Sequence, residues 1–147
     1  MSPTISCSSV YKIFGNNAQT LLSQSGGNVD AKKFQEAGCI VGVNDASFDV
    51  NQGEMLVVMG LSGSGKSTLL RCISRLTDAT SGKILIDGED ITNLSPQDRV
   101  KRGISFVPQS KNVFAVLTVK ENLEVGAFLR NDNLDKILND IYDCFLF

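Results

Sequence analysis

The chain has 147 residues, enough for one ordinary domain. Hydrophobic residues make up 42% and charged residues 20%, which is a globular composition, and the net charge of −2 does not indicate a nucleic-acid partner. The sequence has no histidine and its four cysteines form no CxxC pair, which argues against a Cys/His zinc site and excludes Ser-His or Cys-His nucleophile chemistry. No apolar run approaches the roughly 20 residues of a membrane-spanning helix, and Met1–Phe14 lacks a signal-peptide pattern.

The first third of the chain predicts two strands separated by a helical excursion. Val10–Phe14 fits a strand, and residues 16–38 fit an insertion of short helical pieces interrupted by glycines. Val43–Val50 alternates apolar and polar residues, as a half-buried strand does.

The middle third predicts the strand, loop and helix order of an α/β fold. Met55–Met59 is a short apolar run that suits a strand buried on both faces, and Ser67–Leu76 carries apolar residues at helical spacing. A turn at residues 80–82 precedes a strand at Lys83–Asp87, and Ile104–Val107 predicts a further strand.

In the last third of the chain, helix-capping residues and one amphipathic pattern predict the helices. Ser95 and Pro96 have the cap and first-position chemistry of a short helix. Thr118 and Glu121 have the spacing of a capping box for a helix that runs to about Leu129. Residues 134–147 form the clearest amphipathic pattern in the chain, and its full apolar stripe predicts a helix truncated inside a domain.

One motif carries chemistry. The pattern GxxxxGK[ST] is formed by Gly60, Leu61, Ser62, Gly63, Ser64, Gly65, Lys66, Ser67 and Thr68. Its glycines let successive backbone N–H groups point at phosphate oxygens, and the following helix adds the positive end of its dipole. Lys66 would place its charge on the β- and γ-phosphates of ATP, and the Ser67 hydroxyl would bind Mg²⁺. A plain Gly/Ser turn is the alternative, but the motif lies between a predicted strand and a predicted helix, as a P-loop does.

Further motifs identify a family resemblance. Leu61 to Ser64, residues 67–71, residues 80–84 and Asp87-Gly88 resemble the ATP-binding subunits of ABC transporters, and Phe106 to Gln109 resembles their Q-loop. Residues 42–48, 59–68 and 84–91 are similar to glycine betaine/proline importer ATPases, whereas residues 103–109, 112–114 and 117–127 are more similar to branched-chain amino acid importer ATPases. The two halves therefore point to different solutes, and a hybrid coding sequence is one explanation.

The resemblance implies roles for named residues. Lys66, Ser67, Thr68 and the amides of Ser62 to Gly65 would bind phosphate and Mg²⁺. Gln109 would reach the Mg²⁺ and the attacking water. Phe14 would stack on adenine, with plain core packing as the alternative.

The resemblance also implies an architecture and partners. The fold class is α/β, a P-loop NTPase of the ABC ATPase type with a mixed sheet, incomplete at the C-terminal side. The domain would be partial over 1–147, with a helical insertion at 16–38, the P-loop to Q-loop core at 43–129 and the truncated helix at 134–147. Its partners would be a transmembrane permease subunit, a second ATPase subunit and, indirectly, a solute-binding protein, and it would work at the cytoplasmic face of the membrane.

Three parts of a complete ABC ATPase are missing from these 147 residues. There is no apolar strand ending in Asp-Glu, no Leu-Ser-Gly-Gly-Gln signature and no switch histidine. Ile84 to Asp87 imitates the first but comes too soon after the P-loop and runs into Gly88. Ser25 to Gly27 imitates the second but precedes the P-loop and lacks the glutamine. The sequence therefore predicts nucleotide binding without efficient hydrolysis. Two alternatives are another P-loop enzyme, disfavoured because Asn-Lys-x-Asp is absent, and a truncated non-catalytic nucleotide-binding module.

Overall fold

The computed structural model describes residues 3–110, 112–130 and 132–145. The chain divides into two compact units, residues 1–106 and residues 107–147. The boundary falls between Phe106 and Val107, within the Q-loop-like segment.

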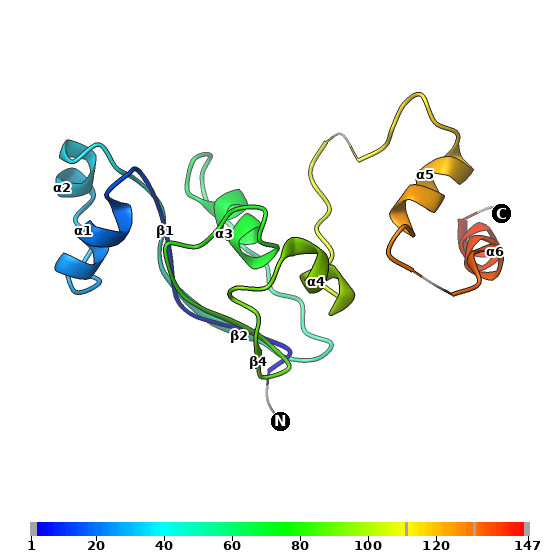
Figure 1. Cartoon of the computed structure of the whole chain (residues 1–147), viewed down its shortest axis with the longest axis horizontal. Helices are drawn as coiled ribbons and strands as arrows, with labels where there is room; N and C mark the ends of the chain where they lie inside the picture. The colour runs from blue at the N-terminus through cyan, green and yellow to red at the C-terminus, as the bar shows by residue number, and fades with distance from the viewer. Residues whose placement is uncertain (1–2, 111, 131, 146–147) are drawn as a thin grey trace. The chain divides into compact units, whose positions relative to one another are not determined.

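A four-stranded sheet is the centre of the first unit (Figure 1). Its strands are β1 (Ile5–Phe14), β2 (Ile40–Val50), β3 (Ser81–Ile86) and β4 (Glu89–Asp90), in the order β2-β1-β3-β4. All pairings among the described residues are antiparallel. The three longer strands cover or overlap the predicted strands 10–14, 43–50 and 83–87, and Ala46, Phe48 and Val50 are half-buried between exposed neighbours as the alternation predicts.

The predicted helical excursion between β1 and β2 is present. Its two helices, α1 (Ala18–Gln24) and α2 (Ala31–Glu36), lie at one end of the β1–β2 pair (Figure 1). The Asp30 carboxylate accepts hydrogen bonds from the backbone N–H groups of Lys32 and Lys33 and so caps α2. The excursion has its own small hydrophobic core, made of Tyr11, Ile13, Ala18, Leu22, Phe34 and Cys39.

Helix α3 (Lys66–Ile73) follows the glycine loop and lies against the main core of the first unit. The buried residues of that core are Cys7, Val10, Cys72, Ile84, Ile86 and Ile91. The helix ends earlier than the predicted Leu76, because Arg75 adopts the left-handed conformation with φ of +55°. Helix α4 (Pro96–Lys101) begins as predicted: the Ser95 hydroxyl accepts from the Asp98 N–H, and Pro96 occupies the first helical position.

Two predicted strands are wrong. Met55–Met59 and residues 104–107 have no strand pairing. Leu56 and Val58 are less exposed than Met55, Val57 and Met59, so the alternation of a strand persists. Leu56 and Val58 line an apolar hollow of about 430 Å³. A strand buried on both faces needs neighbouring strands to complete its hydrogen bonds, and the described residues supply none for either segment.

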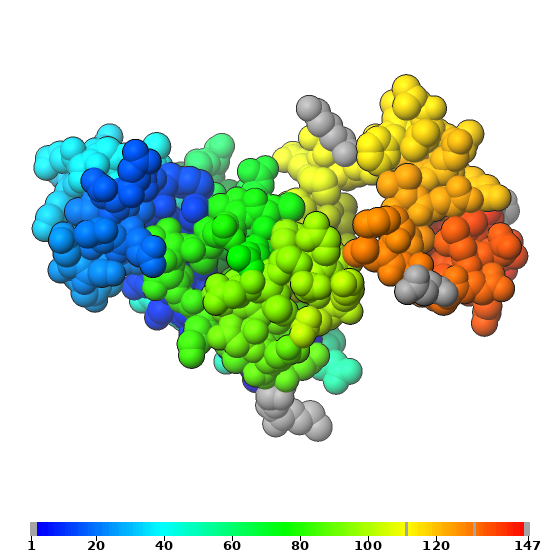
Figure 2. All heavy atoms as spheres, viewed as in Figure 1, coloured from blue at the N-terminus to red at the C-terminus, as the bar shows by residue number. Residues whose placement is uncertain are grey.

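The second unit contains two helices, α5 (Val119–Gly126) and α6 (Leu134–Phe145), whose atoms lie together in Figure 2. The predicted capping box is present: Thr118 accepts from the Glu121 N–H, and the Glu121 carboxylate accepts from the Thr118 N–H. Helix α6 covers the predicted amphipathic segment up to Phe145, and residues 146–147 of that prediction lie outside the described residues. Leu138 is the buried residue of α6. Among the described residues, no helix is both long and apolar enough to cross a membrane.

Candidate functional site: the glycine loop before α3

The glycine loop turns directly into α3, and Gly65 makes that turn possible. Gly65 is the N-cap residue of α3 and has a φ of +88°. A Cβ atom at Gly65 would overlap the carbonyl oxygen of Gly42 in β2, so only glycine lets the loop come this close to the strand. The first turn of α3 is thereby held against the sheet.

The N-terminus of α3 has no side-chain cap. Gly65 offers no side-chain acceptor, and the first turn contains no acidic residue. By contrast, Ser95 caps α4 and Thr118 caps α5 through their hydroxyl groups. A helix N-terminus without such a cap leaves backbone N–H groups and the positive end of the dipole available to an anion. This feature of the loop fits a phosphate group.

Lys66 folds back over the loop. Its ammonium group donates to the carbonyl oxygens of Gly60 and Leu61, both at 2.7 Å, and to the Ser64 hydroxyl at 3.3 Å. These acceptors hold the charge of Lys66 above the loop that the motif assigns to phosphate. Phosphate oxygens are stronger acceptors than neutral carbonyls, because hydrogen bonds between charged groups are about twice as strong as neutral ones.

Ser67 and Thr68 lie in the first turn of α3. Ser67 is exposed, as a hydroxyl that binds a metal ion from solvent needs to be, and Thr68 is half-buried. The Thr68 methyl group faces β2, where a Cβ atom at Gly42 would lie 3.2 Å from it. Oxygen ligands such as the Ser67 hydroxyl suit Mg²⁺, which also keeps several of its waters in phosphate sites.

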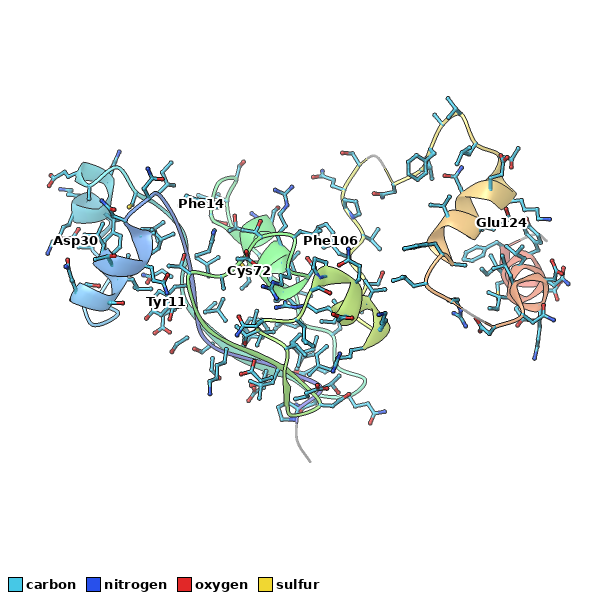
Figure 3. The ribbon with its side chains drawn as sticks, viewed as in Figure 1. Tyr11, Phe14, Asp30, Cys72, Phe106 and Glu124 are labelled. Atoms are coloured by element: carbon cyan, nitrogen blue, oxygen red, sulfur yellow. The ribbon has the colours of Figure 1, made fainter. Side chains whose placement is uncertain are left out.

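Phe14 lies at the end of β1, close to the glycine loop (Figure 3). Its ring edge approaches Gly42 from the same region as Thr68, since a Cβ atom at Gly42 would lie 2.8 Å from the Phe14 ring. The side chain is 42% exposed, so Phe14 is not a buried core residue, and the Lys12 ammonium lies 4.8 Å from the ring centroid. A partly exposed ring beside the start of α3 is available to stack on a base, which would lie against the ring in competition with the Lys12 ammonium.

Gln109 belongs to the second unit. It is exposed and lies in a bend after Pro108, with no helix or strand around it. The first unit thus brings together Phe14, the loop and the first turn of α3, while Gln109 is positioned by a different part of the chain.

Three residues that the sequence did not single out are important for local packing, in the glycine-loop region, in α4 and in the loop before α5. Gly42 provides the close approach of strand and loop, and it lies just before the predicted strand Val43–Val50, where the alternation gave no signal for it. Arg99 is buried, with 1% of its surface exposed. An arginine in a polar helix is normally exposed, so the sequence did not predict this burial. The Asn122 side chain makes four hydrogen bonds to the backbone of residues 114–118.

Comparisons with known proteins identify the family of the chain. The sequence profile of the ABC transporter family matches residues 43–143. The chain is 57% identical over 145 residues to the trimethylamine N-oxide transport system ATP-binding protein TmoW of Pelagibacter ubique, covering 92% of this chain and 42% of that protein. It is 43% identical over 131 residues to the glycine betaine/carnitine transport ATP-binding protein GbuA of Listeria monocytogenes, covering 85% of this chain and 32% of that protein.

The resemblance to amino acid importers covers less of the chain. A probable branched-chain amino acid transport ATP-binding protein LivF of Archaeoglobus fulgidus is 45% identical over 84 residues, covering 57% of this chain and 36% of that protein. The match to TmoW, in contrast, extends over both halves of the chain in one alignment. The chain spans less than half the length of each of these relatives.

A solved structure shares the fold. The dimeric post-hydrolysis structure of the ATP-binding cassette MJ0796, bound to ADP and Pi, superposes with a TM-score of 0.65 at 25% sequence identity and covers 88% of this chain and 50% of that one. The profile match over more than half of the chain, the relatives and the α/β fold with its glycine loop lead to one assignment. The chain belongs to the ABC transporter ATP-binding family.

Proposed function

We propose that this chain is the nucleotide-binding part of the ATP-binding subunit of an ABC importer for betaine- or trimethylamine N-oxide-type solutes. The observation that carries the nucleotide role is the uncapped N-terminus of α3 beside the folded-back Lys66. The solute class is supported by the relatives TmoW and GbuA, which transport such compounds by name.

In this proposal each residue of the site has a defined task. The loop amides of Ser62 to Gly65 and the first turn of α3 hold the phosphates, and Lys66 exchanges its carbonyl acceptors for phosphate oxygens. The Ser67 hydroxyl would bind Mg²⁺, which supplies charge neutralisation when it is bound, and Gln109 keeps the Mg²⁺ role that the family resemblance implies. Phe14 stacks on adenine.

The same proposal limits what these 147 residues do by themselves. They contain no histidine and no Asp-Glu pair after an apolar strand, so the general base and the γ-phosphate sensor of the family have no counterpart here. The chain therefore binds nucleotide without hydrolysing it efficiently. Phosphate release by the purified chain tests this: turnover above background that Lys66→Ala abolishes would overturn it.

The whole subunit would work with a transmembrane permease subunit, a second ATPase subunit and a solute-binding protein, at the cytoplasmic face of the membrane. An uptake assay in the source cell tests the solute class. Replacing Lys66 by alanine in the native gene should abolish uptake of labelled glycine betaine or trimethylamine N-oxide and leave leucine uptake intact. Loss of leucine uptake alone would favour the amino acid importers instead.

A further inference from the structure

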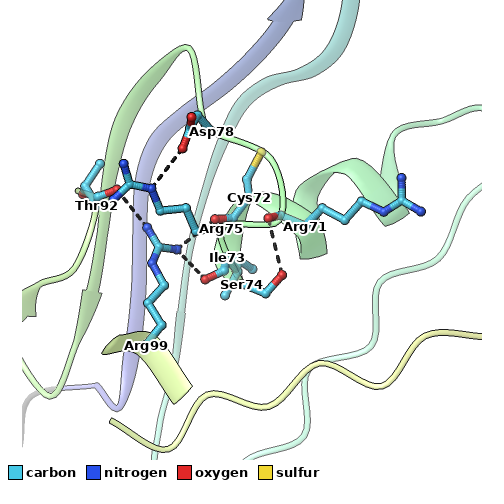
Figure 4. Close-up of polar contacts among 8 residues, drawn as sticks. All are labelled: Arg71, Cys72, Ile73, Ser74, Arg75, Asp78, Thr92 and Arg99. Atoms are coloured by element: carbon cyan, nitrogen blue, oxygen red, sulfur yellow. Dashed lines mark hydrogen bonds and ion pairs between the residues drawn. The ribbon is translucent and has the colours of Figure 1, made fainter. Parts of the chain in front are cut away.

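Arg99 of α4 has an unusual environment for an arginine. Its side chain is among the most deeply buried of the described residues, at 1% exposure. The structure records no ion pair between Arg99 and a carboxylate in the described part of the chain. Its guanidinium group instead donates to three backbone carbonyl oxygens (Figure 4): Cys72 at 2.9 Å, Ile73 at 2.5 Å and Thr92 at 2.8 Å.

Two of those carbonyls belong to the last two residues of α3. The final carbonyls of a helix lack partners within the helix and carry the negative end of its dipole. The preceding two, those of Leu70 and Arg71, accept from Ser74 and Thr77 in the following turn. The Cys72 carbonyl also accepts from the Arg75 N–H at 3.2 Å, so Arg99 adds a positive charge there and is the recorded donor to Ile73. All four terminal carbonyls of α3 thus have a partner.

The same helix begins at the glycine loop. Gly65 allows the N-terminal end of α3 to lie against Gly42 of β2. At the C-terminal end, the Arg99 side chain links α3 by hydrogen bonds to the carbonyl of Thr92, in the segment after β4. A helix of eight residues spans only about 12 Å, so a shift at one end is carried to the other. The two anchors together fix where the first turn of α3 stands.

From this arrangement we propose that Arg99 is a positioning residue for phosphate binding, holding α3 so that its first turn stays in place at the glycine loop. The nucleotide part of this inference rests on the function proposed above. The positioning part concerns α3 itself and can be measured without any ligand.

Two variants and a matched control test it. Arg99→Met keeps the length of the side chain and removes every donor, and Arg99→Lys keeps the charge but not the fork that reaches three carbonyls. Arg102→Met makes the same change three residues along the chain, where the arginine forms a surface pair with Glu89 and, among the described residues, donates no side-chain hydrogen bond to α3.

The first measurement is hydrogen exchange of the Leu69 amide, which donates to the Gly65 carbonyl at 2.9 Å in the first turn of α3. Arg99→Met should speed this exchange about tenfold, Arg99→Lys by less, and Arg102→Met not at all, while strand amides of β1 and β3 keep their protection. Unchanged exchange at Leu69, or an equal loss of protection in the strands, would overturn the proposal. If Arg99→Met does not fold, Arg99→Lys decides by the same criterion.

The second measurement is binding of a fluorescent ATP analogue with Mg²⁺. Arg99→Met should weaken it about tenfold and Arg102→Met should leave it unchanged. If the wild-type chain binds no nucleotide, the function proposed above fails, and the exchange of Leu69 still decides whether Arg99 positions α3. Normal binding by a folded Arg99→Met chain would overturn its role in phosphate binding.

Discussion

Gly65 of the glycine loop lies so close to the carbonyl group of Gly42 in β2 that a side chain at Gly65 would overlap it. At Gly42 a side chain would instead meet the Phe14 ring and the Thr68 methyl group. Gly42 and Gly65 are therefore the place where β2, the Phe14 ring and the first turn of α3 meet. This contact brings together parts of the candidate site that lie far apart in the sequence.

A second glycine of the loop, Gly63, is a matched control for Gly65. Gly63 and Gly65 both have positive φ, +79° and +88°, but a side chain at Gly63 would meet nothing within 4 Å. Gly63→Ala should lower the free energy of unfolding only by the backbone strain, about 1–2 kcal/mol. Gly65→Ala should cost about 3 kcal/mol or more, because β2 must also move, and it should abolish ATP binding. Equal effects in urea unfolding would contradict the close approach.

The position of Phe14 predicts a change that depends on the base of the nucleotide. Phe14→Ala should weaken ATP binding about tenfold, as loss of stacking on a base does, and leave binding of inorganic triphosphate unchanged. Ile40→Ala is the control, since Ile40 is the cross-strand partner of Phe14 and is 69% exposed. If Phe14→Ala weakens both ligands equally, the ring supports the fold and does not stack.

Asn122 should stabilise the loop before α5. Its side-chain amide donates to the carbonyls of Phe114, Leu117 and Thr118 and accepts from the Phe114 N–H at 2.7 Å. Asn122→Ala should lower the free energy of unfolding of the second unit by about 1–3 kcal/mol and speed exchange of the Phe114 amide. Lys120→Ala, which removes an exposed pair with Glu124 on the same helix, should have little effect. A protected Phe114 amide in Asn122→Ala would contradict this.

Because the Cys7 thiol is buried, we expect the chain to lose stability at high pH. Burial raises the pKa of the Cys7 thiol to about 11 from an ordinary value of 9.0. Between these pH values the folded chain keeps a proton that the unfolded chain has lost, so the free energy of unfolding should fall as pH rises from about 9 towards 11.

The measurement is urea unfolding as a function of pH. Cys7→Ala should make the decline shallower, whatever its stability at pH 7. Cys144→Ala, at an exposed thiol, should leave the decline unchanged. An identical pH dependence in wild type and Cys7→Ala would show that Cys7 ionises equally in both states.

Local signals in the sequence were sufficient where the structure is local. The caps at Ser95 and Thr118 and the apolar stripe of α6 depend on residues within one or two turns, and they appear as predicted. The predicted strands at Met55–Met59 and residues 104–107 depend on pairing with distant segments, which an apolar run does not specify. The glycine motif predicted the loop and α3, but the approach of Gly42 and the buried Arg99 arise from tertiary packing that no spacing in the sequence encodes.

The central claim is that the glycine loop binds the phosphates of Mg-ATP. Titrating the purified chain with a fluorescent ATP analogue tests it most directly, with Lys66→Ala as the variant and Lys83→Ala, at an exposed position of β3, as the control. The account predicts saturable binding that Lys66→Ala weakens about 10- to 100-fold, the loss expected for a hydrogen bond between charged groups, and that Lys83→Ala leaves intact. Binding that is equally strong in Lys66→Ala, or absent from the folded wild-type chain, would contradict it.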